Sequence, residues 1–127
     1  MISRINLWDT ATNVASTAAI TSQVIDQKTA KGNCSLLVVL DGTTPSVNIK
    51  QTVSDTELGT YYTPYDADDN DLGKIGTLLT SSTIRRFSVV PAPYMKLTIT
   101  GSAGNGANTT VKAYLLLQEG KIIGGGA

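Results

Sequence analysis

The sequence predicts an all-β fold: a single antiparallel β-sandwich of about eight short strands with an extended N-terminal segment. Three observations indicate it. Apolar and polar residues alternate with a period of two over most of the chain, as along half-buried strands. Gly, Pro, Asn and Asp separate these segments, and no stretch shows the apolar stripe of an amphipathic helix. Because 127 residues make one domain of ordinary size, residues 1–127 are expected to form one unit.

The N-terminal part of the chain has the weakest strand pattern. We expect strands at residues 2–8 and 20–26, separated by a small, polar stretch rich in Ala, Ser and Thr. This stretch, residues 10–21, predicts an extended arm or a long loop, so residues 1–19 should form an extended arm or an edge strand. At the other end, residues 120–127 are rich in Gly and predict a flexible tail.

The middle of the chain contains four predicted strands. Residues 34–40 are almost continuously apolar, which is typical of a strand buried on both faces. Residues 47–53 alternate and follow a turn signal at Asp41-Gly42 and Pro45, so they are expected to form a hairpin arm opposite the first. Residues 74–80 and 83–90 are two further candidates.

The clearest alternation lies near the C-terminus. Residues 94–100 place Met95, Leu97 and Ile99 on one face, and residues 110–118 repeat the pattern. Between them are residues 101–108, dominated by Gly and Asn, which tolerate positive φ angles. These features predict an antiparallel hairpin with a loose tip.

The last of these strands has an unusually apolar outer face. Leu116 is expected to lie there beside Tyr114, with Lys112 as its charged guard. Exposed strands are usually protected by charges or proline. We therefore expect this outer face to be buried, either by a second layer of sheet or by another subunit.

Composition excludes several classes of function. The chain has ten Lys and Arg, ten Asp and Glu, and no His. Without imidazole there can be no Ser-His-Asp or Cys-His catalysis and no histidine-containing zinc site. A net charge of zero argues against a nucleic-acid partner, and the longest apolar run, residues 36–40, is too short to span a membrane. We expect a protein that is not an enzyme and needs no cofactor.

An acidic segment at residues 66–71 resembles the start of a calcium loop. Asp66, Asp68 and Asn70 occupy alternating positions that suit oxygen ligands. The pattern then fails, because Asp71 replaces the Gly of the sharp turn and Thr77 the bidentate Glu. A solvated acidic loop is the favoured interpretation, with a calcium site of another type as the alternative.

Aromatic residues and arginines are the remaining candidates for binding. Tyr61, Tyr62 and Tyr65 form a cluster that could stack on sugar rings or anchor a subunit interface, and Trp8 could do the latter. Arg85 and Arg86 are adjacent in a predicted strand, so at most one can face the solvent side of the sheet. The other is expected at a sheet edge or beside a carboxylate.

Part of the chain resembles a known family. Asp41-Gly42, residues 46–51, Ser54-Asp55 and the later stretch 93–101 are similar to a pattern in head decoration (cement) proteins of tailed bacteriophages. The family usually carries Trp after the Ser-Asp turn, where this chain has Tyr61. The resemblance, over residues 41–118, implies a jelly-roll-like sandwich that forms trimers or dimers on the capsid and braces the major capsid protein.

Three functions follow from these observations. The leading one is a non-enzymatic virion structural protein, made in the host cytoplasm, that decorates and stabilises the capsid surface. The second is a carbohydrate-binding module of a phage tail or fibre that uses the tyrosine cluster. The third is a tail-tube or connector protein. The candidate interface residues are Trp8, Tyr61, Tyr62, Tyr65, Arg85, Arg86, Tyr114 and Leu116.

Overall fold

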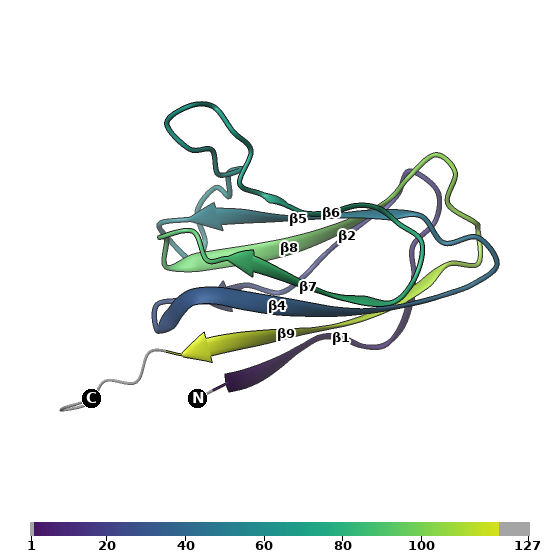
Figure 1. Ribbon diagram of the computed structural model, residues 1–127, viewed down its shortest axis with the longest axis horizontal. Helices are drawn as coiled ribbons and strands as arrows, with labels where there is room; N and C mark the ends of the chain where they lie inside the picture. The colour runs from purple at the N-terminus through teal and green to yellow at the C-terminus, as the bar shows by residue number, and fades with distance from the viewer. Residues whose placement is uncertain (1, 120–127) are drawn as a thin grey trace.

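Nine strands in two antiparallel sheets make up residues 2–119, the part of the chain that the computed structural model describes (Figure 1). The prediction of an all-β sandwich is therefore confirmed. The strands are β1 (Ile2–Asn13), β2 (Ala19–Thr21), β3 (Ile25–Asp26), β4 (Ala30–Asp41), β5 (Val47–Ser54), β6 (Lys74–Leu79), β7 (Thr83–Ser88), β8 (Tyr94–Gly101) and β9 (Thr110–Glu119). The predicted flexible tail at residues 120–127 lies outside the described residues.

The strand order is that of a jelly roll. One sheet, here called sheet A, has the order β1-β9-β4-β7. The other, sheet B, has the order β2-β8-β5-β6, with β3 also paired to β8. Most strands are therefore followed in the chain by a strand of the opposite sheet, which is how a jelly roll closes its two layers over one core.

The two predicted hairpins are wrong. Strand β8 belongs to sheet B and β9 to sheet A, and β4 and β5 are divided in the same way. Both members of each pair do turn an apolar face inward, but these faces meet across the sandwich instead of lying side by side. The tip of the β8–β9 connection is not loose either, because Asn105 is buried there and hydrogen-bonded.

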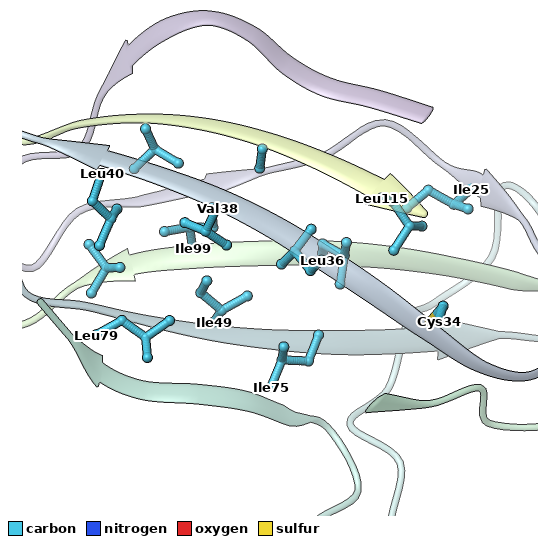
Figure 2. Packing of buried hydrophobic residues seen from close by; sticks show 14 of the residues in the cluster. Ile25, Cys34, Leu36, Val38, Leu40, Ile49, Ile75, Leu79, Ile99 and Leu115 are labelled. Carbon is cyan, nitrogen blue, oxygen red and sulfur yellow. The ribbon is translucent and has the colours of Figure 1, made fainter. Parts of the chain in front are cut away.

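The core lies between the inner faces of the two sheets (Figure 2). Leu36 and Leu115 from sheet A and Ile49 and Ile99 from sheet B belong to it, and all four are at most 1% exposed. Such burial is the main favourable term in folding, at about 1.5–3 kcal/mol for each large side chain. The expectation that residues 34–40 are buried on both faces is wrong, because Val39 is 37% exposed on the outside of β4.

The N-terminal segment is an edge strand of sheet A. Strand β1 pairs with β9 through two irregularities, between Asn6 and Trp8 and between Trp8 and Thr12. Part of the predicted loop at residues 10–21 is therefore strand. The predicted strand 20–26 is interrupted at Ser22. There the Ser22 hydroxyl, and not a backbone carbonyl, accepts the hydrogen bond from the Leu97 amide, at 2.9 Å. The Ser22 amide donates in turn to the Leu97 carbonyl at 2.8 Å.

Candidate functional site

The outward side of sheet A is a face built from four strands that no other part of residues 2–119 covers. Register fixes its members, because residues directly opposite in paired strands share a face. They are Ile2, Arg4, Asn6 and Asn13 on β1, Thr110, Lys112, Tyr114, Leu116 and Gln118 on β9, Asn33, Ser35, Leu37, Val39 and Asp41 on β4, and Ile84, Arg86 and Ser88 on β7. This set is called the outer face of sheet A below.

Apolar side chains occupy the middle of this face. Tyr114, Leu37 and Ile84 are in register across three adjacent strands. Ile84 is 61% exposed, whereas Leu37 and Tyr114 are half-buried. Leu116 lies in the next row, opposite Ser35. An apolar row that continues across several strands is typical of a protein-contact surface.

Three cations surround the apolar centre. The guanidinium carbon of Arg4 lies 4.1 Å from the centroid of the Tyr114 ring. Arg86 is opposite Ser35 on the β7 side, and Lys112 is opposite Val39. Within residues 2–119, the one salt bridge in the structure is between Lys28 and Asp26, away from this face. The three cations therefore have no carboxylate partner in the described part of the chain.

The outside of sheet B has a different character. Thr98 and Thr100 on β8 lie opposite Lys50 and Asn48 on β5, and Thr52 lies opposite Lys96. These side chains are hydroxyls, amides and ammonium groups. The outer face of sheet B is thus polar, whereas that of sheet A combines an apolar centre with polar and charged side chains around it.

Residues 55–72 of the segment between β5 and β6 project from the sandwich and are called the 55–72 lobe (Figure 1). Backbone hydrogen bonds hold it in shape. Val53 and Tyr62 exchange both of theirs, at 2.9 and 2.8 Å, and the Leu72 amide donates to the Pro64 carbonyl at 2.8 Å. The lobe is therefore a folded excursion anchored at its base.

Acidic and apolar side chains share the surface of this lobe. It holds six of the ten carboxylates of the chain and no Lys or Arg: Asp55, Glu57, Asp66, Asp68, Asp69 and Asp71. Leu58 is 96% exposed, Tyr62 66%, Tyr65 58% and Leu72 42%. The three tyrosines predicted to cluster are all here.

Tyr61 differs from the other two tyrosines because both its ring and its hydroxyl contact other residues of the chain. Its hydroxyl donates to the Glu57 carbonyl at 2.8 Å, and the Lys96 ammonium lies 4.4 Å from its ring centroid. Desolvation, together with the Glu57 charge, raises the pKa of its phenol. Tyr62 and Tyr65 are the members of the set that remain open to an external ligand.

The acidic residues 66–71 form a turn that is held by hydrogen bonds from within the turn to the Asp66 carboxylate. One Asp66 carboxylate oxygen accepts the Asp68 and Asn70 amides at 2.8 and 2.9 Å, and the other accepts the Asn70 side-chain amide at 2.9 Å. These hydrogen bonds, led by the one from the Asn70 side chain, lower the pKa of Asp66. Residues 2–119 contain no group of three or more Asp, Glu, Cys or His side chains able to hold a metal ion.

The structure divides the other predicted interface residues between two sides of sheet A. Arg86, Tyr114 and Leu116 belong to its outer face. Trp8 is opposite Ala113 and packs against the core, and Arg85 is opposite Leu36 at the free edge of β7, where it is exposed.

Sequence reasoning missed most members of the outer face, among them Arg4, Leu37 and Ile84. Alternation along β4 could have suggested Leu37. The other two depend on which strands flank β9 and β4, which only the topology supplies.

Comparisons with known proteins give a similarity of fold. No protein-family model and no curated protein matches the sequence. The crystal structure of SPBc2 prophage-derived protein YomS is similar, with a TM-score of 0.49 and 17% identity over 92% of this chain and 94% of that chain. At this level the likeness concerns the fold, and no functional conclusion rests on it. No helix among the described residues is long and apolar enough to cross a membrane.

Proposed function

We propose that this chain is a non-enzymatic structural protein of a bacteriophage particle, which binds the major capsid protein and stabilises the shell. It would do so as a homo-oligomer on the outside of the virion. The observation that carries the proposal is the outer face of sheet A, where Tyr114, Leu37 and Ile84 form an uncovered row. The resemblance of residues 41–118 to decoration proteins suggests the major capsid protein as the binding partner.

A rigid sandwich with such a face acts by contact. Apolar area removed from water contributes about 25 cal/mol per Å², and rim charges add specificity and association rate. Bracing a shell requires these properties. The outer face and the 55–72 lobe supply the contact area through which copies of the chain can assemble into the oligomer that binds the shell.

Capsid binding tests the proposal directly. Capsids of the particle encoded in the same genome, assembled without this chain, are incubated with the purified protein and sedimented. We expect saturable co-sedimentation in a fixed ratio, with the temperature of capsid disruption raised. Binding to purified tails in place of heads would favour the tail-tube or connector role, and absence of saturable binding to either would contradict the proposal.

Tyr62 and Tyr65 favour carbohydrate binding as a second candidate. Both are more than half exposed on the acidic lobe, at 66% and 58%, and exposed rings can stack on sugars. A glycan array with Tyr62→Ala and Tyr65→Ala variants tests it. Binding that disappears in both variants but persists in Thr21→Asp, a variant on the far side of sheet B, would support this function.

A further inference from the structure

Exposed apolar side chains are concentrated on two separate surfaces. Of the eight large apolar side chains exposed within residues 2–119, three lie on the outer face of sheet A and four on the 55–72 lobe. Figure 1 shows the lobe beyond β5, on the side of the sandwich away from β4, β9 and β1. The tip of the lobe therefore lies away from the outer face of the same molecule, whereas Asp71 and Leu72 at its base line a hollow together with Arg86.

The two surfaces carry opposite charges. Arg4, Arg86 and Lys112 surround the apolar centre of the outer face, and its paired rows hold one carboxylate, that of Asp41, opposite Thr110 at the end of β4. The lobe has six carboxylates and no cation. Complementary charge around apolar contacts steers association and selects the partner.

Charge also decides how two copies can meet. Packing the outer face on a second outer face would bring Arg4, Arg86 and Lys112 of both copies together, and like charges opposed at an interface are unfavourable. Packing two lobes would oppose twelve carboxylates in the same way, six from each copy. When the lobe of one copy packs on the outer face of the other, the cations meet carboxylates and the apolar side chains of both surfaces are still in contact.

We infer that the outer face of sheet A is the docking site for the 55–72 lobe of a second copy of this chain. The contact is head-to-tail, so it repeats from copy to copy and closes into a ring where the rotation allows. This inference deepens the proposed function, because it rests on the homo-oligomer proposed there. It assigns the interface by which that oligomer forms.

Sedimentation equilibrium on the full chain measures the association. Ile84→Asp places a carboxylate on the face, and Leu58→Asp removes an apolar contact from the lobe. Each side chain is largely exposed, at 61% and 96%, so both variants should keep the wild-type circular dichroism spectrum. Each should weaken self-association by roughly tenfold or more. Thr21→Asp, an exposed position on sheet B, is the matched control and should associate as the wild type does.

Mixing the two variants gives the decisive result. The intact lobe of Ile84→Asp can bind the intact face of Leu58→Asp, but the remaining lobe and face are both defective. A one-to-one heterodimer with little that is larger is expected from the mixture, at concentrations where each variant alone stays largely monomeric because its self-association is weakened. Added salt should weaken the wild-type oligomer, since the rim contacts are between exposed charges.

Several results would overturn the inference. A wild-type chain that stays monomeric at the highest attainable concentration would do so, as would an oligomer lost in Ile84→Asp but kept in Leu58→Asp. Equal loss in Thr21→Asp would also contradict it. All these measurements are made without capsids, so failure here is distinct from a failure of co-sedimentation.

Discussion

The side-chain amide of Asn105 donates to the Val14 carbonyl at 2.7 Å, although the two residues are 91 positions apart in the sequence. Both residues are buried, at 6% and 0% exposed. The side-chain oxygen of Asn105 (Oδ1) also accepts hydrogen bonds from the Ser46 backbone amide at 3.0 Å and from the Thr109 hydroxyl at 2.7 Å. One asparagine thus joins three connections at one end of the sandwich, those between β1 and β2, β4 and β5, and β8 and β9.

Replacing this asparagine should destabilise the fold. Asn105→Ala removes three hydrogen bonds and leaves buried backbone groups unpaired, which costs about 2–4 kcal/mol in the free energy of unfolding. Asn108→Ala, in the same connection, is the control. Its side chain bonds Thr43 in an exposed setting, so the loss should be about 0.5 kcal/mol or less. Urea denaturation measures both, and equal losses would contradict the proposed role of Asn105.

Two neighbouring leucines test the register of β9. Leu115 is 0% exposed in the core and Leu116 lies half-buried on the outer face. Leu115→Ala should cost about 2–5 kcal/mol, because it leaves a cavity, whereas Leu116→Ala should cost about 1 kcal/mol or less. Because a shift of one residue exchanges the two faces, the reverse order of stabilities would show that the register is wrong.

Alternation predicted the strands well because it is a local property. It correctly separated Leu115 from Leu116 and Leu97 from Lys96. It could not predict which sheet each strand joins, since a connection such as residues 102–109 suits a hairpin or a crossing between sheets. The outer face depends on that choice. Ile84 and Leu116 share it only because β7 and β9 both flank β4, and no spacing in the sequence encodes this.

Cys34 should be unreactive in the folded protein. Burial raises the pKa of its thiol to about 12, and the thiolate is the reactive form. At neutral to mildly alkaline pH, Ellman's reagent should label it only when urea unfolds the chain. A fast reaction of the native protein would show that the thiol is accessible.

The same pKa shift makes stability depend on alkaline pH. The unfolded thiol ionises near its ordinary pKa of 9.0, whereas the folded thiol remains protonated up to about 12. The contribution of Cys34 is therefore complete below pH 9 and is lost as the pH rises toward 12. The difference in unfolding free energy between the wild type and Cys34→Ala should shrink over this interval. A constant difference would contradict the assignment.

Asp66 gives the corresponding test at acid pH. Hydrogen bonds from the Asn70 side chain and from the Asn70 and Asp68 amides lower its pKa below the ordinary 3.8. Since the folded pKa is the lower one, the carboxylate stabilises the turn above pH 3.8, and this support is lost as the pH falls through the folded pKa. Titration of the Asp66 carboxyl carbon by NMR measures the midpoint.

Removing the largest of these contributions should move that midpoint in a known direction. Asn70→Ala deletes the side-chain donor but keeps the backbone amide, so the pKa of Asp66 should rise toward 3.8. Asp69→Asn is the control, because it removes a nearby negative charge and leaves every donor to Asp66 in place. A charge effect would lower the pKa of Asp66 further, so Asp69→Asn should produce no rise. If both variants raised the midpoint equally, the turn would be held by something other than its hydrogen bonds to Asp66.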